Sequence, residues 1–216
     1  VFFPAVGALI LYLLPDDEEN LIRRLALVFS LVPLALTLYL WFQFDRSFPT
    51  FQFEEMAEWF PAIGASYHVG LDGISLALVL LTTILTPVAV LASFEIEERV
   101  RMYMVLFLAL ETGMLGLFAA LDLLIFFIFW EIGLVPMYFL IRLWGGKDRN
   151  YASFKFFIYT MAGSLGLLLS IQLIGLATGT FDIVQLMDVW VNLSGDVLPG
   201  SGLPVDLVKG VTYVLF

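Results

Sequence analysis

Long intervals without charge recur along this sequence and constrain its fold more than any other feature. They are residues 1–15, 25–44, 73–94, 102–120, 123–141 and 156–181, and only Glu111 and Glu131 interrupt them. A helix needs about 20 apolar residues to cross the roughly 30 Å hydrocarbon core of a bilayer, and most of the intervals reach that length. We therefore predict an all-α polytopic membrane protein with six transmembrane helices and the start of a seventh in residues 205–216.

The loops between these intervals carry turn and capping signals. Asp72, Asp122 and Asn150 stand where the N-caps of the third, fifth and sixth helices are expected. Short alternating apolar and polar runs in the 45–72 loop predict a small β-hairpin there. Both ends of the sequence fall inside apolar stretches, so we expect the first span to be clipped and the seventh helix to be truncated.

The distribution of basic residues predicts the orientation in the membrane, because cytoplasmic loops are enriched in Lys and Arg. The connections after the first, third and fifth spans hold eight of the ten Lys and Arg. These eight are Arg23, Arg24, Arg99, Arg101, Arg142, Lys147, Arg149 and Lys155, whereas the other connections hold only Arg46 and Lys209. The N-terminus is therefore predicted on the non-cytoplasmic side, with segments 45–72 and 182–205 outside.

Composition excludes several classes of function. The sequence has a net charge of −10, and its acidic residues lie largely in loops. This charge argues against nucleic-acid binding. The sequence has no cysteine, which excludes disulfides, thiolate metal sites and cysteine-ligated iron–sulfur clusters within it. We expect no cofactor-binding residue and no metal ligand here.

Glu111 and Glu131 are the principal candidate functional residues. A carboxylate near the centre of a membrane helix costs about 2.5–3.5 kcal/mol on insertion scales, so its presence calls for an explanation. At 1.5 Å per residue both acids lie roughly 13–15 Å from a membrane boundary, on spans joined by a short turn. Pro136 loosens the helix beside Glu131. Two readings remain open: the acids carry protons, or they hydrogen-bond neighbouring helices and lock the bundle.

For two further residues we weigh a structural role against a functional one. Lys155 stands at the cytoplasmic start of the sixth span, where its side chain snorkels to the surface or serves as a proton relay. His68 is the sole histidine of the sequence and is expected in a loop outside the core, where a structural role is favoured over a metal site.

Residues 129–164, FWEIGLVPMYFLIRLWGGKDRNYASFKFFIYTMAGS, resemble the antiporter-like proton-pumping membrane subunits of respiratory complex I. The run YHVGLDGIS at 67–75 is similar to a motif of the same family. The Trp-Glu and Pro-Met-Tyr elements resemble most the NADH-quinone oxidoreductase chain M type, the counterpart of mitochondrial subunit 4. The family is related to Mrp antiporter subunits.

The resemblance implies a fold of about fourteen helices containing two inverted five-helix repeats. Residues 1–100 would hold helices 1–3 and an external loop at 45–72, and residues 101–216 would begin the first repeat. Glu131 would pair with a seventh-helix lysine beyond the sequence shown, since Lys209 comes too early in that helix. Glu111 would be the fourth-helix acid of the same proton path.

The resemblance also implies partners and a location. The neighbours would be other membrane-arm subunits of complex I, including further antiporter-like subunits, within the lipid bilayer of a bacterial inner membrane. FMN, iron–sulfur clusters and quinone are expected in partner subunits, and no redox active site on this chain. A cation/proton antiporter of the Mrp type, a membrane-bound hydrogenase subunit and a non-transporting structural subunit remain alternatives.

Overall fold

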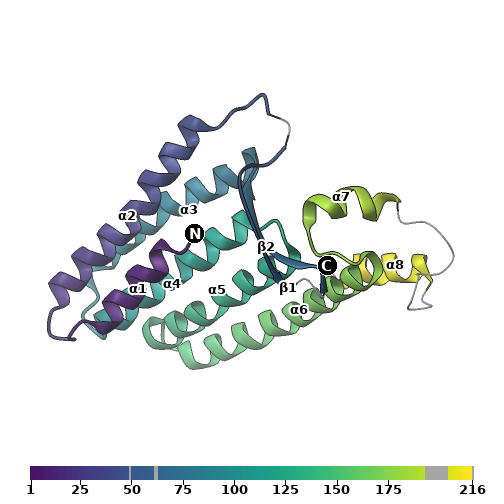
Figure 1. Ribbon diagram of the computed structural model, residues 1–216. Coiled ribbons are helices and arrows are strands. Elements are labelled where there is room, and N and C mark those ends of the chain that lie inside the picture. The colour runs from purple at the N-terminus through teal and green to yellow at the C-terminus, as the bar shows by residue number, and fades with distance from the viewer. Residues whose placement is uncertain (49, 61–62, 193–203, 216) are drawn as a thin grey trace.

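The structure is a computed structural model, and it describes residues 1–48, 50–60, 63–192 and 204–215. Its helices run in chain order as α1 (Phe3–Leu13), α2 (Glu19–Gln43), α3 (Gly73–Ala92), α4 (Val100–Ala119), α5 (Leu123–Trp144), α6 (Arg149–Thr178), α7 (Ile183–Asn192) and α8 (Val205–Leu215). Figure 1 shows α1 to α6 running side by side along one slanted direction, with α7 and α8 beside one end of α6.

Five helices of the described chain, α2 to α6, are long and apolar enough to cross a membrane. The first predicted span forms the shorter apolar helix α1, and α8 forms where the seventh helix was expected to begin. The prediction of an all-α polytopic membrane protein is therefore confirmed. The exposed side chains of the helices are largely apolar, as expected for surfaces that contact lipid or neighbouring subunits.

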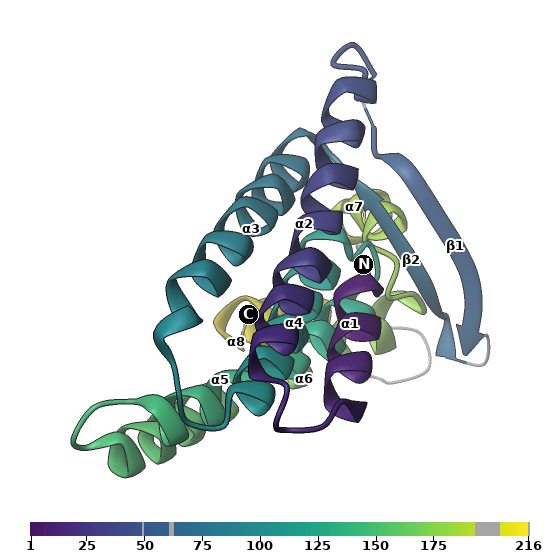
Figure 2. The ribbon, with the colours of Figure 1, turned by 90° about the vertical axis from the view of Figure 1, so that its left-hand side faces the viewer.

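α4 is the central helix of the bundle and contacts α1, α2, α3 and α5 (Figure 2). One core cluster joins α1, α2 and α4 through side chains such as Leu11, Ile22 and Met104, all of them fully buried. Because α4 is surrounded on several sides, polar residues in its middle are removed from both water and lipid. This position decides the environment of Glu111.

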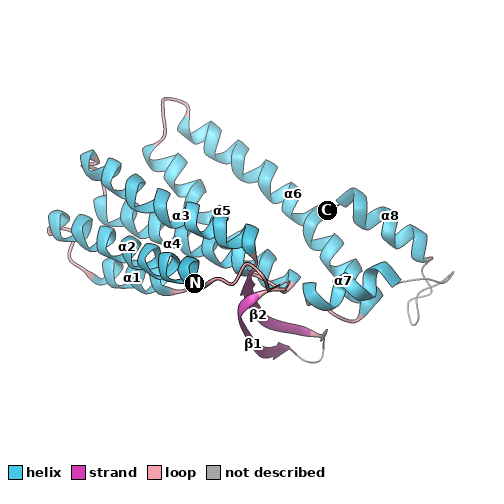
Figure 3. Ribbon diagram, turned by 90° about the horizontal axis from the view of Figure 1, so that it is seen from above, coloured by secondary structure: helices cyan, strands magenta, loops and turns pink. Residues whose placement is uncertain are grey.

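The predicted hairpin is confirmed as β1 (Gln52–Phe60) and β2 (Ala65–Leu71), two antiparallel strands. Figure 3 shows the hairpin on one side of the helical layer, near the ends of α4 and α5. β2 is largely buried, whereas β1 is largely exposed. The backbone N–H of Leu121, in the α4–α5 link, donates to the carbonyl oxygen of His68 at 2.9 Å, so β2 holds this link in place.

Two of the three predicted caps are confirmed. The Asp72 side chain accepts from the Ser75 N–H in a capping box at the start of α3, and Asp122 accepts from the first turn of α5. Asn150 is not a cap: it lies inside α6, which begins one residue earlier, and the N-cap position is Asp148 without a side-chain hydrogen bond. The segment 182–205, expected to be an external loop, contains the helix α7.

Candidate functional site

Glu111 lies in the middle of α4 and is completely buried. Neither of its carboxyl oxygens has a hydrogen-bond partner among the described residues. An ionised carboxylate in such a place is costly, because no counter-charge among the described residues offsets its desolvation. The protonation state of Glu111 therefore has a strong effect on the free energy of the folded protein.

Glu131 lies on α5, the neighbour of α4, and its side chain is only partly buried. One of its two oxygens, Oε1, is buried without a hydrogen-bond partner among the described residues. Pro136 lies within α5 five residues further on, and the helix continues past it to Trp144. Glu131 therefore presents a carboxyl group at the surface of the bundle, at membrane depth, where a further helix or subunit can reach it.

A close backbone contact sets the register of the two acids. A Cβ added to Gly113 would lie 3.0 Å from the backbone nitrogen of Gly133 and 3.3 Å from the carbonyl oxygen of Phe129. Gly113 thus faces the turn of α5 that contains Glu131. Since α4 and α5 are antiparallel, Glu111 and Glu131 lie within about one helical turn, roughly 5 Å, of each other along the bundle axis. The shared depth expected from the sequence agrees with this register.

Lys155, on the first part of α6, is exposed. Its Nζ lies 5.6 Å from the ring centroid of Tyr151 and 5.9 Å from that of Tyr159, which are cation–π distances. Within the described chain it makes no ion pair with either glutamate. The structure thus places Glu111 and Glu131 at a similar level on neighbouring helices, each two residues from the α4–α5 contact positions, and leaves Lys155 at a different place.

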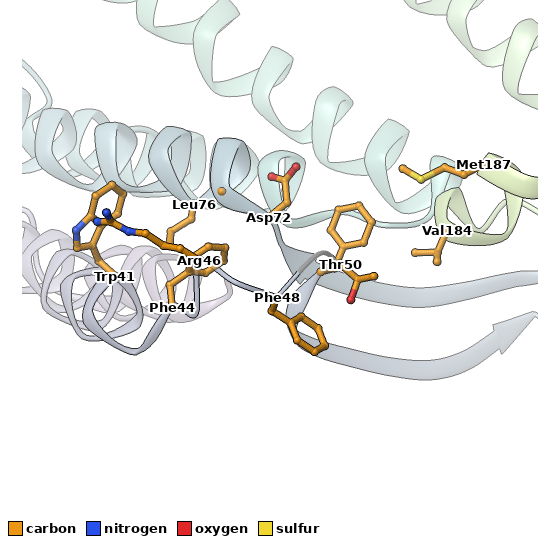
Figure 4. A pocket seen from close by; sticks show the side chains of 11 residues that line it. Trp41, Phe44, Arg46, Phe48, Thr50, Asp72, Leu76, Val184 and Met187 are labelled. Atoms are coloured by element: carbon orange, nitrogen blue, oxygen red, sulfur yellow. The ribbon is translucent and has the colours of Figure 1, made fainter.

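The cavity in Figure 4 lies at the hairpin end of the bundle and has a volume of about 630 Å³. It is lined by the end of α2, the loop before β1, the start of α3 and part of α7. In Figure 4 the Arg46 side chain extends toward Trp41, and Asp72 stands at the start of α3. Neither glutamate nor Lys155 lines this cavity, so it is separate from the pair of acids.

A second polar cluster lies where β2 meets the N-terminal ends of α5 and α7. His68 is 5% exposed, and its Nδ1 is 2.7 Å from Oδ2 of Asp182, while its Nε2 is 3.3 Å from Oε2 of Glu54. Asp122 is completely buried and accepts the Ser66 N–H at 3.0 Å. Among the described residues, no group of three or more His, Asp or Glu has a metal-binding arrangement.

Comparison with known proteins places this geometry in a family. Residues 20–118 match the family model described as NADH-ubiquinone oxidoreductase chain 4, amino terminus. Residues 120–203 match the model described as NADH:quinone oxidoreductase/Mrp antiporter, TM. The chain belongs to the antiporter-like membrane-subunit family that NADH:quinone oxidoreductases share with Mrp antiporters.

A curated relative of this antiporter-like subunit is NAD(P)H-quinone oxidoreductase chain 4-3 of Nostoc sp., which is 42% identical over 220 residues. The match covers 100% of this chain but 39% of that relative, so the sequence spans well under half of the relative's length.

Solved structures carry the same fold. Respiratory complex I from Thermus thermophilus with bound NADH contains a chain with a TM-score of 0.75 and 27% identity, covering 99% of this chain and 42% of the other. The Mrp complex of Dietzia sp. contains a chain with a TM-score of 0.76 and 24% identity, covering 99% and 22%, which shows the shared fold.

Sequence reasoning missed the cluster of His68, Asp182, Glu54 and Asp122 in the antiporter-like subunit. His68 was expected in a loop outside the core, but it lies on a buried strand and contacts Asp182. The two residues are separated by 114 positions, so no local pattern joins them. The available signal was Asp122: a capping aspartate at a membrane boundary is a natural partner for polar groups of a neighbouring loop.

Proposed function

We propose that this chain forms the N-terminal part of a proton-translocating membrane-arm subunit of NADH-quinone oxidoreductase, of the chain M or chain 4 type. The main support for this proposal is Glu111, which is completely buried within a membrane span. Its carboxyl oxygens have no hydrogen-bond partner among the described residues. Glu131 on the adjacent helix supplies a second carboxyl at nearly the same depth. Ionisable groups inside membrane spans are characteristic of ion and proton pathways.

The proposed mechanism depends on charge coupling. A proton reaches the membrane interior from the side of Arg142 and Lys155 and is held on a lysine of the seventh helix, which lies beyond this sequence. Glu131 is exposed enough for such a lysine to reach it, and a nearby cation stabilises its ionised form. When that coupling weakens, the proton is released to the opposite side. Glu111 supplies a further protonation site, and Lys155 a candidate relay at the boundary.

The proposal extends to organisation and surroundings. Residues 1–100 would form an N-terminal unit of helices, and residues 101–216 would open the first of two inverted repeats. Other membrane-arm subunits would be its neighbours, and FMN, iron–sulfur clusters and quinone would belong to partner subunits that release the driving energy. The membrane would be a bacterial inner membrane, with the N-terminus on its non-cytoplasmic side.

The decisive experiment replaces Glu131 with Gln in the full-length protein within its assembled complex. Membrane vesicles then report NADH-driven quinone reduction and proton uptake together. We expect Glu131→Gln to remove most proton translocation and coupled turnover, and Glu111→Gln to lower both in part. Glu58→Gln, an exposed acid on β1, is the matched control and should behave like the wild type. A normal proton-to-electron ratio in Glu131→Gln would refute the assignment.

The second candidate is a cation/proton antiporter subunit of the Mrp type, favoured by the family model that spans both groups and by the fold shared with the Dietzia complex. Sodium-dependent proton exchange in vesicles without NADH or quinone turnover would select this candidate. A membrane-bound hydrogenase subunit is the remaining alternative. The same vesicle assay tests it when hydrogenase substrates replace NADH. Intact transport after both Glu→Gln changes would instead indicate a structural subunit.

A further inference from the structure

A second cavity of about 630 Å³ opens where α4 begins and α5 ends. Residues of α1, the first turn of α2, α4 and α5 line the cavity. Its lining combines three arginines, Arg99, Arg101 and Arg142, with an apolar part formed by Leu106, Val135 and Phe139. The cavity is thus charged at one end and apolar at the other.

The two ends of this cavity lie at different depths in the membrane. The spans Val100–Ala119 and Leu123–Trp144 have their boundary here, next to Arg99 and Arg142. Leu106 lies about 9 Å further along α4 than Val100, and Val135 about 10 Å back along α5 from Arg142, at 1.5 Å per residue. The cavity therefore runs from the charged boundary of the membrane into its hydrocarbon layer.

The three arginines differ in whether their charges already have partners within the described chain. Arg101 binds Asp16 at 2.8 Å, donates to the Leu14 carbonyl oxygen at 2.6 Å and stacks over the Tyr12 ring. Among the residues that the structure describes, Arg142 has polar and cation–π contacts with Tyr138 alone, through its hydroxyl and its ring.

The side chain of Arg99 is exposed and has no hydrogen bond or ion pair with any residue that the structure describes. Two cations on one side of the cavity therefore lack an anionic partner. The acids of the other wall do not supply one, since Asp16 binds Arg101 and Glu19 binds Arg23 at 3.1 Å.

The backbone at Arg99 is held in an unusual conformation. Its φ is 52°, in the left-handed region, which side chains larger than Gly adopt rarely and at a cost. The neighbouring Glu98 carbonyl oxygen accepts from Nε1 of Trp144 at 2.8 Å, and the Trp144 ring packs edge-on against Tyr103. The end of α5 thus fixes the turn that presents Arg99, and no side chain caps the N-terminus of α4 beside it.

We propose that this cavity binds a glycerophospholipid. Its phosphodiester lies between Arg99 and Arg142, and one acyl chain covers Leu106, Val135 and Phe139. The guanidinium groups match phosphate oxygens in charge and geometry, and basic pockets between membrane helices are suited to anionic headgroups. Free inorganic phosphate shares the headgroup chemistry but makes no use of the apolar part. The proposal does not depend on proton transport.

The test uses phosphatidylglycerol with a photoreactive diazirine in its acyl chain, added to membranes that contain the full-length protein in its assembled complex. After illumination, mass spectrometry of peptides locates the adducts. We expect adducts in 102–106 and 135–139, and about tenfold fewer in the double variant Arg99→Gln, Arg142→Gln. Arg24→Gln, an exposed arginine of α2 outside the cavity, should leave the adducts unchanged.

Unchanged labelling in the double variant overturns the proposal, and so does loss of labelling on addition of excess inorganic phosphate. If the double variant does not assemble into the complex, a second variant tests the proposal. Val135→Trp fills the apolar part while both arginines stay, and it should also remove the adducts. Persistent adducts in 102–106 with Val135→Trp would overturn the proposal independently.

Discussion

Glu111 and His68 are both buried, but their surroundings give opposite consequences for stability. Glu111 has no hydrogen-bond partner among the described residues, so its side chain adds nothing to the packing except an unsatisfied polar group. His68 contacts Asp182 and Glu54 and joins β2 to the start of α7 and to β1. Substitutions at the two positions therefore separate a functional acid from a structural histidine.

Replacing Glu111 with Leu should not lower the stability of the assembled complex. The substitution exchanges a buried polar group without a partner for an apolar one, which is neutral or stabilising by up to about 1–3 kcal/mol. Thermal unfolding of the detergent-purified complex measures this directly. A clear loss of stability would show that Glu111 locks the helices together, which is the structural alternative to proton transfer.

Replacing His68 with Ala should destabilise the contact between the hairpin and the start of α7. The change leaves buried Asp182 without its 2.7 Å partner, which costs about 1–3 kcal/mol. Hydrogen exchange of the Leu121 and Ile183 N–H groups, which bond to the His68 and Leu121 carbonyl oxygens, should accelerate. Glu54→Gln is the control and should have little effect, because the Glu54 side chain is 43% exposed. Unaltered exchange in His68→Ala would contradict the role of this contact.

At the scale of elements, the close packing of α4 against α5 depends on Gly113. The Gly113 Cα faces backbone atoms of Gly133 and Phe129, which are part of a helix and do not move aside as a flexible side chain would. The close approach brings the segments that carry Glu111 and Glu131 together. Helix pairs in membranes commonly use small residues in this way.

Replacing Gly113 with Val should separate α4 from α5 and lower both stability and transport. The added side chain meets backbone at 3.0–3.3 Å, so the helices shift or the variant loses roughly 1–3 kcal/mol. Thermal unfolding and proton uptake by vesicles measure the two effects. Gly163→Ala in α6 is the matched control, since a Cβ there meets nothing within 4 Å. We expect this control to be neutral or slightly stabilising. Equal behaviour of the two variants would refute the packing argument.

The elements themselves were largely predictable, and the exceptions have physical causes. Charge-free length found α2 to α6, because membrane spans must exclude unpaired charges. α7 was missed because it is a short helix that contains Asp188 and so breaks the charge-free pattern. Asn150 was mistaken for a cap because the GGKDRN turn offers several capping residues, and the helix begins before it.

At the scale of the whole molecule, depth could be predicted but lateral arrangement could not. Counting residues along each span placed Glu111 and Glu131 at a common level, because helix rise is nearly constant. Their degree of burial depends on which helices surround α4 and α5, and the sequence gives no direct measure of that. The contact between His68 and Asp182 likewise needs the tertiary structure, since it joins β2 to the start of α7.

The orientation of the whole bundle in the membrane is the last prediction. Ser47 lies between α2 and β1, and Lys147 between α5 and α6, so the two residues mark opposite membrane faces. The sequence contains no cysteine, which allows a single reporter to be placed at either position once any cysteines elsewhere in the full-length chain are replaced. Because basic residues cluster on the Lys147 side, that side should face the cytoplasm.

Intact cells should therefore label Ser47→Cys with a membrane-impermeant maleimide, whereas Lys147→Cys should react only after permeabilisation. Both positions are exposed, so accessibility of the thiol in the folded protein does not limit the reaction. The opposite pattern would reverse the orientation and place the hairpin, His68 and Asp182 on the cytoplasmic face. In that case the proton would enter from the His68 side, and the proposed direction of transport past Glu131 would be reversed with it.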